Sequence, residues 1–587
     1  MQLYKAPNAD IKFNLEAFDY EGQVASIDEY ADFDLDMAMS LLDEHARFCE
    51  NELLPLNESG DRKGIHFNPD DASVTLPEGF KEAFNGYKEA GFLGLPFPPE
   101  HGGTGAPLTL AAVASEVLIA TNKAFSMCPG LTSGLIEALE AHGSDDLKGR
   151  YLENLITGKW SGTMCLTEPQ CGTDLGMLTT KAIPEGDHYR LTGSKIWITF
   201  GEHDLTENIV HLVLARLPDA PPGIKGISVF IVPKVREDGT ANGVSCGGLE
   251  HKMGIHASPT CVINLDNAVG YLVGVPHKGM RAMFTMMNNA RLNVGVEGLA
   301  LSDAAYQHAL AYAKDRRQSR SLDPAKRELD HAADNILVHP DVRRMLLNVK
   351  STNEALRGLV TYIAINIDRA HHCADEADRQ KSDDIVALLT PIIKSYATER
   401  GFENVSECMQ VMGGAGYTQD WPVEQYLRDV RIALIYEGTN HIQALDLVGR
   451  KLPRHGGRLL QTFMGEVTTL IRGSKDTPEL APFISALKER SKQLQAATME
   501  LAGKGMSDQE EAGAAASNYL NLFALTTLAY IWCRQLTHAL SVGGAQQEAK
   551  FQTARYFFDM VLPEADLYAR LASVGKAPMM DFNVDYL

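Results

Sequence analysis

The spacing of hydrophobic positions changes twice along the chain. Helical spacing runs from about residue 36, where DMAMSLLDEHARFCENELL precedes Pro55, to about residue 158. Short runs rich in β-branched residues, separated by glycine, proline and aspartate, then continue to about residue 277. The helical period returns from 278 to 452, and after the loop-like KLPRHGGR more helical pattern follows. The chain therefore alternates helical, β and helical regions.

This order predicts an α+β fold in which the strands are gathered in one central domain. Because the strands follow one another without intervening helices, we expect an antiparallel barrel or sandwich. A dinucleotide-binding βαβ unit is not expected, since GGAGYT at 413–418 does not follow a strand. The predicted parts are an N-terminal extension, a helical domain, a β-domain, a helical bundle and an additional C-terminal helical domain, at 1–35, 36–158, 159–277, 278–452 and 458–587.

One uncharged segment, AGAAASNYLNLFALTTLAYIWC at 512–533, is long enough to cross a bilayer. Its two asparagines and two threonines would be poorly placed in lipid, and charged helical segments flank it closely. We predict a helix buried within a helical bundle, because a helix that is apolar all round is usually core in a large protein.

Charge and cysteine usage narrow the class of protein. The 587 residues include 54 basic and 76 acidic side chains, a net charge of -22 that disfavours nucleic acid and anionic membranes as partners. The only basic cluster is KDRRQSR at 314–320. The nine cysteines form no CxxC pair, and the N-terminus lacks an apolar signal-peptide core. We expect reduced thiols and a cytoplasmic protein.

Two neighbouring segments carry candidate cofactor chemistry. In CLTEPQCGTD at 165–174, small and hydroxyl residues expose backbone N–H groups that could donate to a flavin ring or a phosphate. In KIWITFG at 195–201, Trp197 and Thr199 lie two apart and so share a strand face. Taken alone, the first segment also fits an ordinary connection, and the second a core tryptophan with an edge threonine.

Glu437 poses a different question, because it directly follows the apolar ALIY and precedes a glycine. A buried carboxylate is costly unless it is paired or changes its pKa. The residue either begins a helix, where its charge favours the dipole, or lies in a dry site as a base. A separate segment rich in acidic residues and histidine, AHHCADEADR at 370–379, fits a solvated helix face. We therefore predict no metal site there.

Six motifs in order resemble the acyl-CoA dehydrogenase family over about residues 80–450. They are LTEPQCGTD, KIWIT, HKMGIHASPT, YAKDRRQS, QVMGGAGY and IYEGTN. The resemblance implies a helical domain, a β-domain and a second helical domain, with FAD bound between them. It also implies a cofactor site made of Leu166, Thr167, Gly172, Thr173, Trp197, Thr199, Thr439 and His441, completed in a neighbouring subunit by Arg316, Gln318, Gln410, Gly413 and Gly414.

The same resemblance assigns the chemistry. Glu437 corresponds to the catalytic base, and Arg291, Thr173 and Gly438 to residues near the acyl-CoA substrate. Two positions depart from the family pattern: Ser319-Arg320 follow Gln318 where the family usually has Phe-Gly, and His441 replaces a common glutamine.

The implied activity is FAD-dependent α,β-dehydrogenation of an acyl-CoA thioester. The chain is most similar to the branch that converts 3-methylmercaptopropionyl-CoA to methylthioacryloyl-CoA in dimethylsulfoniopropionate breakdown. An electron-transfer flavoprotein is the implied electron acceptor, and a homodimer or homotetramer the implied assembly. The alternatives are a dehydrogenase for ordinary short, medium or long acyl chains, an acyl-CoA oxidase that uses oxygen, and a non-catalytic flavin-bound relative, some of which associate with DNA. Net charge and the presence of Glu437 argue against the last.

Overall fold

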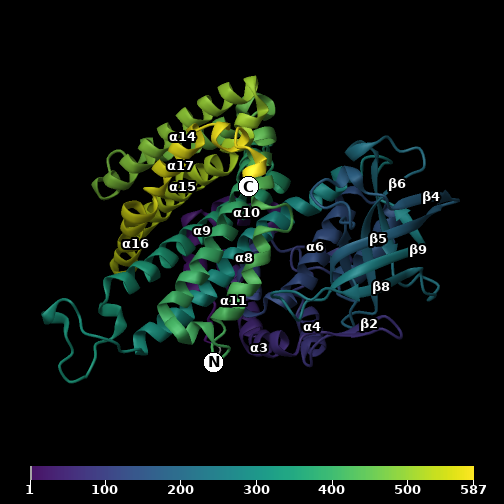
Figure 1. The fold of residues 1–587 in the computed structure, drawn as a ribbon, viewed down its shortest axis with the longest axis horizontal. Coiled ribbons are helices and arrows are strands. Elements are labelled where there is room, and N and C mark those ends of the chain that lie inside the picture. Colours follow the sequence, from purple (N-terminus) through teal and green to yellow (C-terminus); the bar gives the residue numbers. More distant parts are fainter. Residues whose placement is uncertain (1–2) are drawn as a thin grey trace. The chain divides into compact units, whose positions relative to one another are not determined.

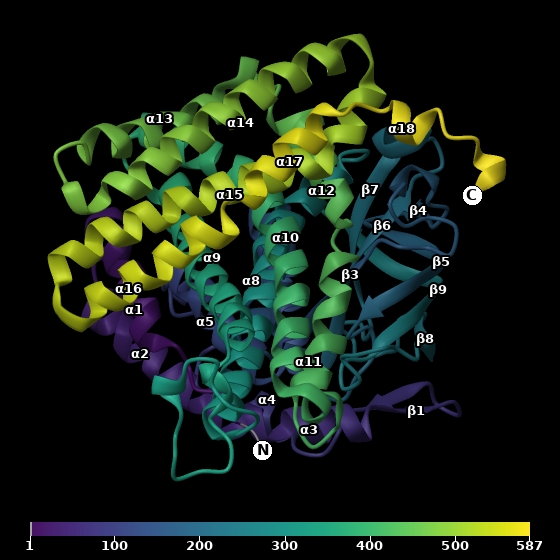
Figure 2. The ribbon, with the colours of Figure 1, turned by 60° about the vertical axis from the view of Figure 1, so that its left-hand side comes forward.

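The computed structural model describes residues 3–587, except for the side chains of residues 287–289. The chain divides into two compact units, each assembled from separate stretches of sequence (Figures 1 and 2). The first unit contains Met1–Asp43, Pro107–Ala120 and Val294–Leu587, and the second contains Glu44–Ala106 and Thr121–Asn293. The predicted boundaries between domains stay a prediction.

The second unit combines helices with a mixed sheet. Its helices are α3 (Leu54–Lys63), α4 (Phe80–Glu89), α6 (Lys123–His142) and α7 (Asp145–Ile156). A small hairpin pairs β1 (His66–Asn68) with β2 (Ser73–Thr75). The main sheet contains β3 (Trp160–Cys165), β4 (Lys181–Glu185), β5 (His188–Thr199), β6 (Asn208–Arg216), β7 (Ile227–Pro233), β8 (Val244–Leu249) and β9 (Thr260–Leu272).

The sheet is not wholly antiparallel, so that part of the prediction was wrong. Strand β3 pairs with β6 in parallel, from Trp160 opposite Asn208 to Cys165 opposite Val213. Strand β4 also touches β6 in parallel, through Lys181 and Arg216. The remaining pairings, including β5–β9 and β6–β7, are antiparallel. The hydrophobic pattern reports which strands are buried, but pairing direction depends on the path of the loops between them.

Burial explains the strand patterns. Strand β7 is buried along its whole length and β6 at every position but the last, which accounts for their continuous runs of valine, isoleucine and leucine. Strand β5 lies nearer the surface, and only Leu191, Lys195 and Ile198 of its residues are buried. Two apolar clusters fill the unit, one joining the sheet to α6 and α7, the other between strands.

The first unit is a helical bundle, as the returning helical period predicts (Figure 2). Helix α8 (Gly279–Asp315) begins in the second unit and continues into this one. The bundle contains α1 (Asn8–Ala17), α2 (Leu35–Phe48, which ends in the second unit), α5 (Leu108–Thr121), α9 (Pro340–His372), α10 (Glu376–Met412), α11 (Val423–Val430), α12 (Asn440–Asp446), α13 (Arg458–Gly473), α14 (Ala481–Ser507), α15 (Gln509–Val542), α16 (Gly544–Tyr556), α17 (Glu564–Ser573) and α18 (Ala577–Met580).

The uncharged segment at 512–533 lies within α15, which packs against α9, α12, α14 and α17. Its large side chains, Tyr519, Phe523 and Trp532 among them, are fully buried. Among the residues described here, no helix combines the length and hydropathy that crossing a membrane requires. The predicted buried helix is confirmed.

The N-terminal extension is folded onto the bundle, which its mixed sequence pattern does not predict. Helix α1 packs on α9 and α15. Where the three helices meet, Gly358 of α9 leaves no room for a side chain. A Cβ there would lie 2.6 Å from Ile531 of α15 and 3.0 Å from the side chain of Asn14 of α1. The side-chain amide of Gln535 donates to Asn14 Oδ1 over 2.7 Å. The first residues and the C-terminal helices are therefore parts of one packed structure.

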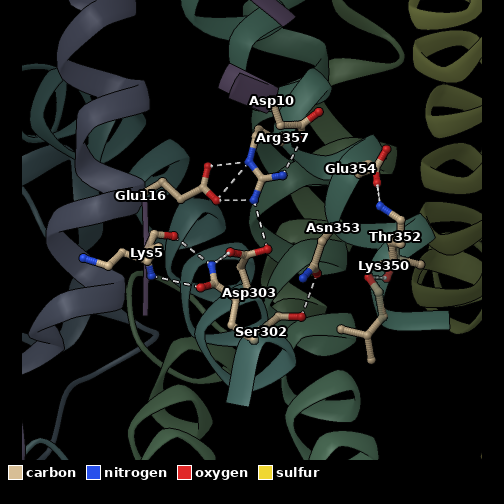
Figure 3. Close-up of polar contacts among 12 residues, drawn as sticks. Lys5, Asp10, Glu116, Ser302, Asp303, Lys350, Thr352, Asn353, Glu354 and Arg357 are labelled. Atoms are coloured by element: carbon tan, nitrogen blue, oxygen red, sulfur yellow. Dashed lines mark hydrogen bonds and ion pairs between the residues drawn. The ribbon is translucent and has the colours of Figure 1, made fainter. Parts of the chain in front are cut away.

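A buried ionic network centres on Arg357 of α9 (Figure 3). Its guanidinium donates to Glu116 on α5 and to Asp10 on α1, and lies 3.1 Å from Asp303 on α8. Lys550 of α16 contacts Asp10 as well, and Glu354 on α9 over 2.7 Å. Burial opposes ionisation of Asp10, but Lys550 and Arg357 outweigh it and hold the pKa of that carboxyl well below its usual range.

Replacing Arg357 by methionine is expected to lower the free energy of unfolding by about 3–5 kcal/mol, because it leaves buried carboxylates without their cation. A matched control is Arg344→Met, since Arg344 forms its ion pairs with Asp341 and Glu407 at a partly exposed position. That change is expected to cost less than about 1 kcal/mol. Chemical denaturation followed by circular dichroism measures both, and equal losses would contradict a special role for the network.

Candidate active site

The loop at 165–174 is fixed by a buried ion pair. Lys195 of β5 is fully buried, and its ammonium donates to Glu168 Oε1 over 2.8 Å and to the carbonyl of Leu166 over 3.1 Å. The backbone N–H of Ile196 donates to the carbonyl of Thr167 over 2.9 Å. Together these bonds place Leu166 and Thr167 beside β5, next to Trp197.

Glu168 makes contacts along its own loop as well. Its two carboxylate oxygens accept from the backbone N–H and hydroxyl groups of Thr179 and Thr180, over 2.6–3.0 Å. Burial raises the pKa of Glu168, but the charge and hydrogen bond of Lys195 and the threonine donors outweigh it and lower the pKa to about 2. Glu168 is thus a structural carboxylate, ionised throughout the physiological range.

Trp197 lies in a β-bulge. The register of β5 against β9 shifts between Lys195 and Ile198, and Trp197 takes a positive φ of 59°. A bulge of this kind redirects a side chain, and Trp197 is accordingly 60% exposed, unlike a core tryptophan. The core-tryptophan interpretation is therefore wrong. Thr199, two residues on and half-buried, pairs with Thr260 of β9.

These residues fit a flavin. They combine an exposed aromatic plane, a threonine hydroxyl and a loop held in place from behind, which suit a planar ring with polar edges. Gly172 and Thr173 are exposed further along the same loop, past a turn in which Glu168 and Cys171 exchange backbone hydrogen bonds of 2.9 Å. Which of these residues bind the cofactor stays a prediction.

Glu437 lies in a tight turn between η10 (Arg431–Leu434) and α12. Both Glu437 and Gly438 have positive φ, 55° and 84°. The side-chain amide of Gln443 donates to the carbonyls of Glu437 and Gly438 over 3.1 and 3.0 Å. Lys394, fully buried on α10, donates to the Gly438 carbonyl over 2.7 Å and to Asn440 Oδ1 over 3.1 Å. The glutamate lies three residues before the first residue of α12 and is half-buried.

The wall behind this turn is built from α8 and α10, whose backbones are in close contact. A Cβ on Gly298 would lie 2.1 Å from the carbonyl oxygen of Ala397, and one on Gly401 would lie 2.4 Å from that of Gly298. Glu297, next to Gly298, accepts a hydrogen bond from the hydroxyl of Tyr436. Burial, reinforced by the nearby Glu297 and Glu437, raises the pKa of Tyr436 well above 10, so this phenol stays protonated.

The residues assigned to a neighbouring subunit's cofactor are exposed. The end of α8 and the loop after α10 are brought together by Tyr312 and Trp421, whose rings are 5.7 Å apart and perpendicular. The five assigned residues lie at these two places and are all exposed: Arg316 and Gln318 just after α8, Gln410 near the end of α10, and Gly413 and Gly414 just after it. The unusual Arg320 pairs with the buried Asp334 over 3.0 Å, within its own loop.

The remaining assigned residues are His441, Thr439 and Arg291. His441 is exposed, and its Nδ1 lies 3.0 Å from the hydroxyl of Ser517 on α15. Thr439 caps α12 by accepting from the N–H of Ile442. Arg291 is buried on α8, one turn after residues whose side chains are outside the described structure. Over residues 3–587, with the side chains of 287–289 set aside, no group of three or more metal-ligating residues converges.

Sequence reasoning missed the side chains that hold both loops in place. Glu168 and Lys195 lie inside the quoted motifs but received no role, and Lys394 and Gln443 were not singled out. A signal for Lys394 was present: it is the single charge in IVALLTPIIKSYAT, an apolar stretch in which a lysine needs oxygen partners.

Lys195→Met is expected to weaken FAD binding by about tenfold or more, because Leu166 and Thr167 lose the cation that fixes their loop. Fluorescence titration of deflavinated protein with FAD measures the dissociation constant. Lys181→Met, at the exposed first residue of β4, is the matched control and should bind normally. Unchanged affinity in Lys195→Met would show that the loop is held without its ion pair.

Acid should loosen the same loop. Because the pKa of Glu168 is lower in the folded protein than its ordinary 4.5, its stabilisation is complete above pH 4.5 and lost as pH falls toward 2. Melting temperature measured between pH 5 and 3 should fall more steeply for the wild type than for Glu168→Gln, which lacks the titrating group. Parallel curves would contradict this assignment.

Family comparisons cover nearly the whole chain. Residues 37–159, 163–268 and 277–452 match the models "Acyl-CoA dehydrogenase, N-terminal domain", "middle domain" and "C-terminal domain". Residues 463–583 match "Acetyl-CoA dehydrogenase C-terminal like". The predicted succession of helical, β and helical domains with extra C-terminal helices is thereby confirmed.

Individual relatives are similar over most of their length. A "3-methylmercaptopropionyl-CoA dehydrogenase" of Ruegeria pomeroyi is 42% identical over 98% of this chain and 99% of its own. A "Butyryl-CoA dehydrogenase" of Syntrophomonas wolfei is 36% identical over 80% of this chain and 78% of its own. The solved structure of an acyl-CoA dehydrogenase complexed with FAD from Bacillus anthracis has a TM-score of 0.75 at 23% identity, covering 92% of this chain and 88% of that one.

Proposed function

Because this chain belongs to the acyl-CoA dehydrogenase family, an FAD-dependent family of oxidoreductases acting on acyl-CoA, we propose that it converts 3-methylmercaptopropionyl-CoA to methylthioacryloyl-CoA. The observation that carries the substrate is the 42% identity to a relative of that name, extending over 98% of the chain. A thioether sulfur and a methylene differ little in size and polarity, so the choice between them depends on small differences in the pocket.

Glu437 is the proposed base. The α-C–H of a thioester is a very weak acid, so its removal needs a carboxylate fixed at the α-carbon and donors for the charge that develops on the thioester oxygen. Glu437 takes the α-proton, and its backbone N–H donates to the thioester oxygen. Gly438 allows the substrate to approach this turn closely, and Arg291 and Thr173 complete the proposed substrate contacts.

Bound FAD would supply the acceptor for the hydride that leaves the β-carbon as the double bond forms. Within the second unit the proposed cofactor residues are Leu166, Thr167, Gly172, Thr173, Trp197 and Thr199. In the first unit they are Thr439 and His441. Trp197 and Thr199 would flank the ring, and backbone N–H groups of the 165–174 loop would donate to its polar edge and to the pyrophosphate.

A homo-oligomer, dimer or tetramer, is part of the proposal. The exposure of Arg316, Gln318, Gln410, Gly413 and Gly414 in a single chain supports it, since exposed residues are available to contact the FAD of a neighbouring subunit. An electron-transfer flavoprotein is the proposed electron acceptor, and the cytoplasm the proposed location. A dehydrogenase for short linear acyl chains is the second candidate, favoured by the butyryl-CoA dehydrogenase relative.

Anaerobic mixing of the FAD-loaded protein with acyl-CoA tests the base and the substrate together. Flavin bleaching should be fastest with 3-methylmercaptopropionyl-CoA, slower with butyryl-CoA and slowest with a long-chain acyl-CoA. Glu437→Gln should bleach about 10²- to 10⁴-fold more slowly, because an amide cannot accept the α-proton.

The other possible outcomes of this experiment would each support a different conclusion. Fastest bleaching by butyryl-CoA would favour the second candidate, and full activity in Glu437→Gln would place the base on another residue. Hydrogen peroxide release in air, at the rate of turnover, would indicate an oxidase. No bleaching with any of the three substrates would contradict the proposed activity.

A further inference from the structure

The turn that carries Glu437 adopts a backbone conformation that it would not keep unaided. Glu437 has a φ of 55°, a left-handed conformation that is strained for a non-glycine residue and persists only when its surroundings impose it. Gly438 follows at 84°, and a Cβ there would lie 2.8 Å from the amide nitrogen of Gln443. Two consecutive left-handed residues thus need an outside restraint.

Lys394 supplies the strongest such restraint. Its bond to the Gly438 carbonyl is 2.7 Å, shorter than the 3.1 and 3.0 Å bonds from the neutral amide of Gln443. Hydrogen bonds from a charged donor are roughly twice as strong as neutral ones. The dependence is mutual, since the fully buried ammonium of Lys394 would be very costly without oxygen acceptors.

Helix α10 is itself fixed at this point. A Cβ on Gly295 of α8 would lie 3.0 Å from the Ile393 side chain, directly before Lys394. One turn further along α10, the hydroxyl of Thr398 donates to Asn440 Oδ1 over 3.2 Å, the same atom that Lys394 contacts. The lysine therefore connects a rigid helix pair to the turn.

We propose that Lys394 is a positioning residue for the dehydrogenation: its buried ammonium holds the Gly438 carbonyl and thereby keeps the carboxylate of Glu437 at the α-carbon of the substrate. The inference rests on the proposed role of Glu437 as the base. Lys394 acts through the backbone of residues 437–440 and does not itself exchange a proton with the substrate. A displacement of about 1 Å at a reacting group can cost about 100-fold in rate.

The test compares Lys394→Met, Gln443→Met and Lys550→Met in the FAD-loaded protein. Lys394→Met should lower kcat about 10- to 100-fold per bound flavin, with KM changed less than about threefold. Gln443→Met, which loses only the weaker neutral bonds, should lower kcat less. Lys550→Met removes another buried lysine, whose partners are Asp10 and Glu354, and should lower the melting temperature with kcat per flavin unchanged.

The kinetic isotope effect separates positioning from general loss of structure. With substrate deuterated at the α-carbon, the effect on kcat should increase in Lys394→Met, because removal of the α-proton becomes the slower step. It should stay at the wild-type value in Lys550→Met. An unchanged isotope effect and kcat in Lys394→Met would overturn the inference, as would a loss that matches Lys550→Met and follows FAD content alone.

Glu437→Gln, measured in the same series, distinguishes failure of the proposed base from failure of the proposed positioning role of Lys394. If it remains fully active, the proposed base is wrong and the role of Lys394 falls with it. If it is inactive while Lys394→Met matches the wild type, Glu437 remains the base and only the positioning role is wrong.

Discussion

A charge taken out of water must be given oxygen or nitrogen partners, and this constraint organises the structure at three places. Arg357 and Lys550 gather carboxylates from several helices of the first unit, Lys195 pairs with Glu168 in the second, and Lys394 is bound by oxygens of residues 438 and 440. Losing one partner of such a group leaves the other buried and uncompensated, so each cluster resists rearrangement. Lys195 and Lys394 lie directly behind a loop that carries proposed chemistry.

The bulge of β5 and the Glu437 turn each combine a residue of positive φ with a buried lysine close by. Trp197 and Glu437 both have positive φ, at 59° and 55°, although neither is glycine. In each case a fully buried lysine on a regular element donates to a backbone carbonyl of an adjoining turn, that of Leu166 or of Gly438. Strained residues that are over-determined by their surroundings concentrate at functional sites. The side chains that we propose to contact cofactor and substrate are thereby held in place by the protein itself.

The segments outside the motif-bearing part of the chain belong to the same core. Asp10 near the start and Lys550 near the end meet in the Arg357 network, and Asn14 receives a hydrogen bond from Gln535. Helix α15 packs on α9 and α12, and its Ser517 contacts His441 beside the Glu437 turn. The C-terminal helices are therefore a structural part of the unit that holds the proposed base.

The succession of helical and β regions, the burial of α15 and the family could all be predicted from the sequence, because periodicity and six motifs in order are local properties of the chain. The parallel pairing of β3 with β6, the packing of α1 on the bundle, and the contacts of Lys195, Lys394 and Gln443 became visible only in the folded chain. Each of these depends on contacts between residues far apart in sequence or on backbone geometry, which no local pattern records. A lysine in an apolar helical segment indicates that a polar partner is needed, but the packing of the helices determines which carbonyl it binds.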